Sequence, residues 1–98
     1  MNVSSKRGLF ERAGLFTDAT SALQVWFETA VAAEWRTLVE VRESFPGTNM
    51  VGDLAIFNIK GNRYRLIVRM VFQYQRIYIE EFLTHAEYSK GGWKKWLS

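Results

Sequence analysis

The fold is decided by residues 54–72, which read LAIFNIKGNRYRLIVRMVF. Two apolar stretches, residues 54–59 and 63–72, are rich in the β-branched and aromatic side chains that favour strands. Between them, residues 60–63 form a turn signal, and Gly61-Asn62 suits a two-residue hairpin turn that requires positive φ angles. The stretch therefore predicts a β-hairpin.

The second strand of this hairpin alternates between two kinds of side chain. Its even positions are all apolar or aromatic: Tyr64, Leu66, Val68, Met70 and Phe72. Its odd positions include three arginines, Arg63, Arg65 and Arg69. Successive side chains of a strand point to opposite faces of the sheet. One face is thus predicted to pack in the core, and the other is predicted to be cationic and open to solvent.

A third strand is predicted over residues 76–83, after a turn at residues 73–75. If that turn centres on Tyr74-Gln75, Arg69 lies opposite Glu80 and Arg65 lies opposite Thr84, while Ile77 and Ile79 face the core. In the first hairpin, Asn58 lies beside Arg65. The predicted open face then carries eight polar or aromatic residues: Asn58, Lys60, Arg63, Arg65, Arg69, Arg76, Tyr78 and Glu80.

The first half of the chain has helical periodicity. Helices are predicted over residues 6–16, after Ser5, and over about 18–36, with Asp18 as the N-cap. A short helix is predicted over 38–45, ended by Pro46-Gly47, and the first few residues can add an edge strand. The predicted class is α+β, with N-terminal helices packed on one face of a small twisted antiparallel sheet.

Ninety-eight residues make one domain. We expect a single domain over residues 1–98, with a helical part at about 5–45, a sheet at about 54–83, and a short helical turn and tail at 84–98. The absence of cysteine excludes disulfides and thiolate zinc sites, and a single histidine excludes a multi-histidine metal site within one chain. We therefore expect no metal and no cofactor.

The net charge of +3 and pI near 9.5 are only mildly basic, so the position of the charges matters more than their sum. No apolar run approaches the roughly 20 residues that span a bilayer, and the N-terminus does not read as a signal peptide. We therefore expect a cytoplasmic protein with no membrane partner.

The residues that suggest chemistry are Thr84-His85-Ala86-Glu87-Tyr88, directly after the third strand. Metal-free RNA cleavage needs a base for the 2′-hydroxyl proton, an acid for the departing 5′-oxygen and cations for the phosphate charge. His85 can transfer protons near neutral pH and Tyr88 can share that work. Arginine and lysine side chains of the cationic face can bind the phosphate.

Each of these features also has a structural interpretation. Thr84 and Glu87 match a capping box, a lone histidine is more often structural than catalytic, and alternating arginines can simply be a solvated sheet face. Arg69 and Glu80 can form a weak cross-strand ion pair. The tail residues Trp93 and Trp96 can stack on bases, pack on the domain or stay free. The residues alone leave these alternatives open.

Three separated segments are similar to the signature of the HigB family of toxins: FNIKGNRYRLIV at 57–68, RIYI at 76–79 and THAEY at 84–88. Phe45-Pro46 and the tryptophan-containing helix also fit. This resemblance implies a RelE-like fold and a metal-independent messenger-RNA endonuclease that acts on the ribosome during translation. It also implies inhibition by a HigA-type antitoxin with a helix-turn-helix domain, through which the complex binds its operator DNA.

The resemblance also implies roles for residues. Lys60, Arg65 and Arg69 would hold the phosphate and stabilise its charge, His85 would transfer protons with help from Tyr88, and Glu87 would contribute or only cap the helix. Further RNA contacts are expected from the rest of the cationic face: Asn58, Arg63, Arg76 and Tyr78.

The chain departs from the family pattern after Tyr88, because the family often has an acidic residue where Ser89 stands. A second reading is therefore a non-catalytic RNA- or ribosome-binding domain on the same scaffold. A third is a partner-binding module without RNA contact.

Overall fold

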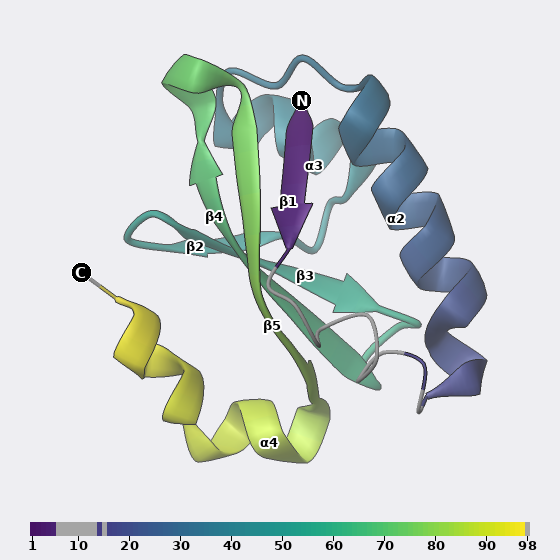
Figure 1. Ribbon diagram of the computed structural model, residues 1–98. Coiled ribbons are helices and arrows are strands. Elements are labelled where there is room, and N and C mark those ends of the chain that lie inside the picture. Colours follow the sequence, from purple (N-terminus) through teal and green to yellow (C-terminus); the bar gives the residue numbers. More distant parts are fainter. Residues whose placement is uncertain (6–13, 15, 98) are drawn as a thin grey trace.

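Figure 1 shows the computed structural model of the protein, which describes residues 1–5, 14 and 16–97. In this part of the chain, the strands are β1 (Asn2–Ser5), β2 (Asn49–Val51), β3 (Leu54–Ile59), β4 (Tyr64–Val71) and β5 (Arg76–Thr84). The helices are α2 (Thr20–Ala32), α3 (Leu38–Ser44) and α4 (His85–Lys90), with 3-10 turns η1 (Thr17–Ala19), η2 (Phe72–Tyr74) and η3 (Gly92–Trp96).

The described strands form one sheet in the order β1-β5-β4-β3-β2. The predicted α+β class and the predicted edge strand at the N-terminus are confirmed. The sheet is mixed, because β1 runs parallel to β5 while the other neighbours are antiparallel. A strand at residues 2–5 also shows that Ser5 belongs to the sheet and not to the helical part of the domain. The helix predicted over 6–16 falls mostly on residues 6–13 and 15, which lie outside the described residues.

Helices α2 and α3 pack on one face of the sheet (Figure 1). Trp26 of α2 lies edge-to-face against Phe57 of β3, with ring centroids 5.3 Å apart. The apolar positions of β4 complete this core, as predicted: Tyr64, Leu66, Val68 and Met70 are all buried.

Helix α2 is shorter at both ends than predicted. It ends at Ala32, before residue 36, and the Met1 amino nitrogen donates to the carbonyl oxygens of Ala30 (3.1 Å) and Val31 (3.0 Å). Carbonyls in the last turn lack partners within a helix, so these contacts allow the helix to stop there. The chain beyond is extended and returns Trp35 to the core.

The predicted N-cap is wrong. Helix α2 begins after η1, its N-cap residue is Ala19, and no side chain caps it. Asp18 instead lies within η1 and accepts hydrogen bonds from Arg63, in the turn before β4, and from Tyr64 of β4.

The register of β3 with β4 is the predicted one, with Asn58 opposite Arg65 and Ile59 opposite Tyr64. The turn itself differs from the prediction. Positive φ angles occur at Lys60 (52°) and Gly61 (64°), and not at Gly61-Asn62. Residues 60–63 thus form a four-residue connection, with the Arg63 amide donating to the Lys60 carbonyl at 3.3 Å.

The predicted register of β4 with β5 is wrong by two residues near the connecting turn. Residues 72–75 connect the strands, with Gln75 in the left-handed conformation (φ 54°), so Arg69 lies opposite Tyr78 and not Glu80. Because the error is even, the faces are unchanged: Tyr78 shares the face of Arg69, and Ile77 and Ile79 are buried.

A bulge between Ile67 and Val68 of the ladder shifts the remaining pairs by one residue. Beyond it, Thr84 lies opposite Tyr64, and Leu83 takes the place opposite Arg65 that was predicted for Thr84. The bulge thus brings the start of α4 level with the beginning of β4.

The sequence predicted that the second face of the sheet is open to solvent, and this prediction is wrong for part of the face. It carries a second apolar cluster: Leu54, Ile56, Ile67, Leu83 and Trp93. Trp93 comes from η3, and Trp96 and Leu97 pack against the same cluster. The C-terminal tail therefore packs back on the domain and covers this apolar cluster, in which Ile67 lies between Arg65 and Arg69 along β4. In Figure 1 the tail lies on the other side of the sheet from α2.

Candidate functional site

The candidate site lies at one end of the sheet, where the turn of residues 60–63 meets the first turn of α4. Thr84 pairs with Tyr64, and the His85 amide donates to the Arg63 carbonyl at 2.9 Å. Because Asn58 lies opposite Arg65, the end of β3 joins the same region. Six predicted site residues are brought together here: Asn58, Lys60, Arg63, Arg65, His85 and Tyr88.

Helix α4 begins with the capping box that the sequence suggested. The Thr84 hydroxyl accepts from the Glu87 amide at 3.2 Å, and the Glu87 carboxylate accepts from the Thr84 amide at 3.1 Å. Glu87 is therefore engaged in capping. The cap fixes His85 at the first position of the helix, where its side chain is exposed.

Tyr88 lies one turn further along α4 and is half-buried. Its ring stacks on Trp93, with centroids 5.2 Å apart and planes inclined by 7°, and the Arg65 guanidinium carbon lies 5.4 Å from its centroid. No described residue forms a hydrogen bond with the Tyr88 hydroxyl or the His85 imidazole.

Asp18 joins the site from the helical part of the chain, and sequence reasoning missed it. Its carboxylate accepts from the Tyr64 hydroxyl at 2.6 Å and from Arg63 at 3.0 Å, and lies 3.6 Å from the Lys60 ammonium. A residue some 45 positions away in the sequence gives no local signal for such a contact. Asp18 ties the turn of residues 60–63 to the helical layer, and it partly offsets the turn's positive charge.

These contacts shift two ionisation equilibria in opposite directions. Hydrogen bonds from Tyr64 and Arg63 and the nearby Lys60 charge hold the pKa of Asp18 below its ordinary value of 3.8, although desolvation opposes them. The hydrogen bond to Asp18, followed by desolvation, raises the pKa of Tyr64 above its ordinary value of 10.0. The pair is therefore strongest with Asp18 ionised and Tyr64 protonated.

Replacing Asp18 with asparagine is expected to remove a pH-dependent part of the stability. The Asp18 contribution is complete above pH 3.8 and is lost as the pH falls through its lowered pKa. The Tyr64 contribution is complete below pH 10.0 and is lost as the pH rises through its raised pKa. Urea unfolding across pH should show Asp18→Asn less stable than wild type near neutrality, with the two curves converging at both extremes.

The matched control for this prediction is Glu28→Gln, since Glu28 is an exposed residue of α2 whose side chain accepts a hydrogen bond from Gln24 of the same helix. Its free energy of unfolding should follow that of wild type at every pH. A destabilisation by Asp18→Asn that is the same from acid to alkaline pH would contradict the prediction.

Arg69 is held by groups of the protein itself. Its guanidinium donates to Asp53 and to the Trp96 carbonyl (2.6 Å), and it lies 4.0 Å from Glu80. The Arg69–Glu80 pair expected from the sequence is thus formed, although the two residues are not directly opposed. With its side chain only 25 % exposed, Arg69 is part of the packing beneath the tail.

Arg76 and Tyr78 lie away from the candidate site. Arg76 begins β5 and Thr84 ends it, so at about 3.3 Å per residue the two are about 26 Å apart along the strand. Tyr78 lies opposite Arg69 in the middle of the sheet. The structure therefore does not bring these two predicted RNA-contact residues together with His85.

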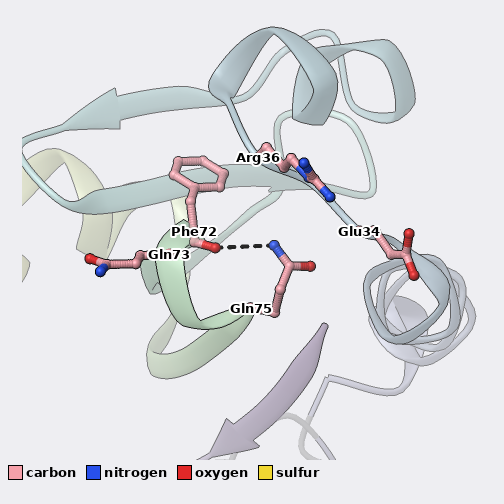
Figure 2. A pocket seen from close by; sticks show the side chains of 5 residues that line it. All are labelled: Glu34, Arg36, Phe72, Gln73 and Gln75. Atoms are coloured by element: carbon pink, nitrogen blue, oxygen red, sulfur yellow. Dashed lines mark hydrogen bonds between the residues drawn. The ribbon is translucent and has the colours of Figure 1, made fainter.

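A separate hollow of about 480 Å³ lies at the far end of β5, next to the turn of residues 72–75 (Figure 2). It is lined by Glu34, Arg36, Phe72, Gln73 and Gln75. Gln75 donates to the Phe72 carbonyl at 3.1 Å and to the Trp35 carbonyl at 2.7 Å, so its amide is used to fix this turn. The hollow lies at the opposite end of β5 from His85, so it is separate from the candidate site.

Among residues 1–5, 14 and 16–97, no three histidine, aspartate or glutamate side chains gather in a way that could hold a metal ion. Nor does any helix among these residues have the length and apolar character needed to cross a membrane.

Comparison with protein families gives one result. Residues 19–91 match the HigB toxin family, described as the RelE-like toxic component of a toxin–antitoxin system. The match confirms the resemblance read from the sequence, and it spans α2, the hairpin strands and α4. Asp18 and Trp93 lie just outside it. A search of curated proteins found no match.

Proposed function

Because the chain belongs to the HigB toxin family, the RelE-like toxic components of toxin–antitoxin systems, we propose that it is an endoribonuclease that cuts messenger RNA. The observation that carries this proposal is the end of the sheet at which His85, Tyr88 and Arg65 meet. The Arg65 guanidinium lies over the Tyr88 ring, and the His85 amide donates to the Arg63 carbonyl at the turn of residues 60–63. Among the described residues, neither the His85 imidazole nor the Tyr88 hydroxyl has a hydrogen-bond partner. This combination supplies proton transfer and phosphate binding together.

The proposed reaction uses the RNA's own 2′-hydroxyl as the nucleophile. His85 removes the 2′-hydroxyl proton, and the 2′-oxygen attacks the adjacent phosphorus. The bond from phosphorus to the 5′-oxygen breaks, and Tyr88 donates its proton to that oxygen. The products are a 2′,3′-cyclic phosphate and a free 5′-hydroxyl.

The cations of the site balance the charge that develops during this reaction. Arg65 lies over the Tyr88 ring, where it stabilises both the phosphate oxygens and the phenolate left after proton transfer. Lys60 and Arg63 are exposed on the turn, so they can bind a neighbouring phosphate of the RNA. Lys60 holds a left-handed backbone conformation that is unfavourable for a side-chain-bearing residue, as is common at functional sites.

A toxin of this family has an antitoxin partner. We further propose that the partner is of the HigA type, with a helix-turn-helix domain through which the complex binds operator DNA. The proposed substrate is messenger RNA engaged by the ribosome in the cytoplasm, and cleavage is proposed to need no metal. The family membership supports each of these proposals, and each is separately testable.

The test is to induce the chain alone in bacterial cells and to map the ends of messenger RNA. New 5′ ends that carry a hydroxyl, together with growth arrest, would support the proposal.

A purified assay tests the two finer proposals. Cleavage of messenger RNA on translating ribosomes should persist in EDTA for as long as the ribosomes remain intact. Cleavage of free RNA would show that the ribosome is not required. Co-expression of a helix-turn-helix protein encoded next to this chain should restore growth, and the lack of such a gene would count against the proposed partner.

One observation favours a second candidate function, a non-catalytic domain that binds RNA or the ribosome. Ser89 stands where the family often has an acidic residue, and its hydroxyl donates to the His85 carbonyl at 3.0 Å within α4. No carboxylate therefore follows Tyr88. Growth arrest without new messenger-RNA ends would favour this second function.

A further inference from the structure

The segment after α4 turns back over the second face of the sheet. Helix α4 ends at Gly91, whose φ of 78° lies in the left-handed region that favours glycine, and the Gly91 amide donates to the Tyr88 carbonyl at 3.0 Å. The following turn, η3, is fastened to the sheet by the contact of Trp96 with Arg69 and by an ion pair between Lys95 and Glu81 (3.7 Å). Its path is therefore set by several separate contacts.

Trp93 is the residue of this segment that reaches the candidate site. Its side chain is 4 % exposed and packs with Leu54, Ile56, Ile67 and Leu83. Its indole ring lies parallel to the Tyr88 ring, and its indole N–H donates to the Tyr88 carbonyl at 3.1 Å. One buried side chain thus fixes both the ring and the backbone of Tyr88.

The contacts continue from Tyr88 to Arg65, whose guanidinium lies over the same ring. We propose that Trp93 is a positioning residue that holds Tyr88 and, through it, Arg65 in the geometry that RNA cleavage requires. This inference rests on the proposed function. The family match ends at residue 91, so it assigns nothing to Trp93. The physical reason is that a tryptophan anchored in an apolar cluster moves far less than a half-exposed tyrosine, and orientation of reacting groups strongly affects rate.

The experiment compares Trp93→Leu with Trp93→Phe and Leu97→Ala. Trp93→Leu keeps a smaller apolar side chain and removes the aromatic stack, whereas Trp93→Phe keeps a ring beside Tyr88. Both variants lose the indole N–H that donates to the Tyr88 carbonyl, so their difference reports the stack. Leu97→Ala is the matched control, because Leu97 packs against the same cluster from the same tail but approaches Gly52, in the turn between β2 and β3. All three variants are first compared by thermal unfolding.

Single-turnover cleavage at saturating substrate should fall about tenfold in Trp93→Leu, with a smaller change in RNA affinity. The cleavage rate of Trp93→Phe should stay within about threefold of the wild-type rate. Leu97→Ala should cleave at the wild-type rate even if its melting temperature falls as much as that of Trp93→Leu. A loss of cleavage that follows the folded fraction equally in Trp93→Leu and Leu97→Ala would overturn the inference, and so would an unchanged rate in folded Trp93→Leu.

A second measurement does not depend on activity. The side-chain NMR signals of Arg65 should be displaced by the ring current of Tyr88 in wild type, Trp93→Phe and Leu97→Ala, and should return toward ordinary values in Trp93→Leu. If the Arg65 signals stay displaced in folded Trp93→Leu, the positioning role is wrong, whether or not the wild type cleaves RNA. If the wild type cleaves no RNA but the signals return toward ordinary values in Trp93→Leu, only the proposed function is wrong. Should Trp93→Leu not fold, Trp93→Met, another apolar residue without a ring, takes its place with the same two outcomes.

Discussion

Replacement of His85 with alanine is expected to lower RNA cleavage by about a hundredfold or more, and to abolish toxicity, while the protein stays folded. General acid–base catalysis by a positioned side chain contributes about 10² to 10⁴ to a rate. The His85 side chain is exposed, and the structure holds α4 through the Thr84–Glu87 capping box and the His85 backbone amide, which alanine retains. The free energy of unfolding should therefore change by no more than about 0.5 kcal/mol. Single-turnover cleavage and urea unfolding measure the two effects.

The matched control for His85→Ala is Thr84→Ala, which removes the cap and leaves the imidazole in place. Loss of a cap costs about 1 kcal/mol, so Thr84→Ala should unfold more easily but retain most of its cleavage. If His85→Ala is instead the variant that unfolds, the histidine has a structural role and the proposed proton transfer is wrong.

Arg65 and Arg69 are expected to respond in opposite ways to the same substitution, methionine. Arg65→Met keeps the aliphatic part of the side chain over Tyr88 and removes the charge, so cleavage should fall about a hundredfold with little change in stability. Among the described residues, the Arg65 guanidinium donates to one acceptor, the Tyr64 carbonyl at 3.1 Å, so its other N–H groups can donate to a phosphate.

Arg69→Met should instead destabilise the protein by about 1 to 2 kcal/mol, because it removes the hydrogen-bond donor to Asp53 and to the Trp96 carbonyl. This value already allows for the solvent exposure of Asp53, which weakens its ion pair with Arg69. Cleavage by the folded fraction should remain close to wild type. The two arginines lie on one face of one strand, four residues apart, so each serves as the control for the other.

RNA binding in rising salt separates the same two residues. Loss of a phosphate contact reduces the slope of log affinity against log salt by about 0.7 to 1. Arg65→Met should show this reduction and Arg69→Met should not. Equal slopes for wild type and Arg65→Met would contradict the assignment of Arg65 to the phosphate.

The candidate site could be predicted in part because its main elements are local. The strand–turn–strand pattern of residues 54–72 and the THAEY segment after β5 placed His85 and Arg65 at one end of the sheet. The β3–β4 register was predictable because a short connection leaves few ways to pair the strands. Packing of the Trp93 tail on the domain was only one of three alternatives that the sequence left open, and the contact of Trp93 with Tyr88 was not predicted.

The β4–β5 register and the bulge could not be predicted in the same way. The error of two residues arose because Gln75, a residue with no strong turn signal, takes a left-handed conformation and lengthens the connection. Its side chain is fixed by the Trp35 carbonyl, a contact with a segment 40 residues earlier. A turn stabilised by a distant part of the chain cannot be read from its own residues.

The sequence by itself determined the α+β class, the strands of the central hairpin, the faces of those strands and the capped helix that carries His85. These features follow from side-chain alternation and from hydrogen bonds between residues close in the chain, and both are written in local order. Tertiary structure alone decided which cations are available. Asp18 and Asp53 each lie next to specific basic side chains, and the tail covers the face around Arg69, because packing of distant segments sets which charges meet and which stay exposed to solvent.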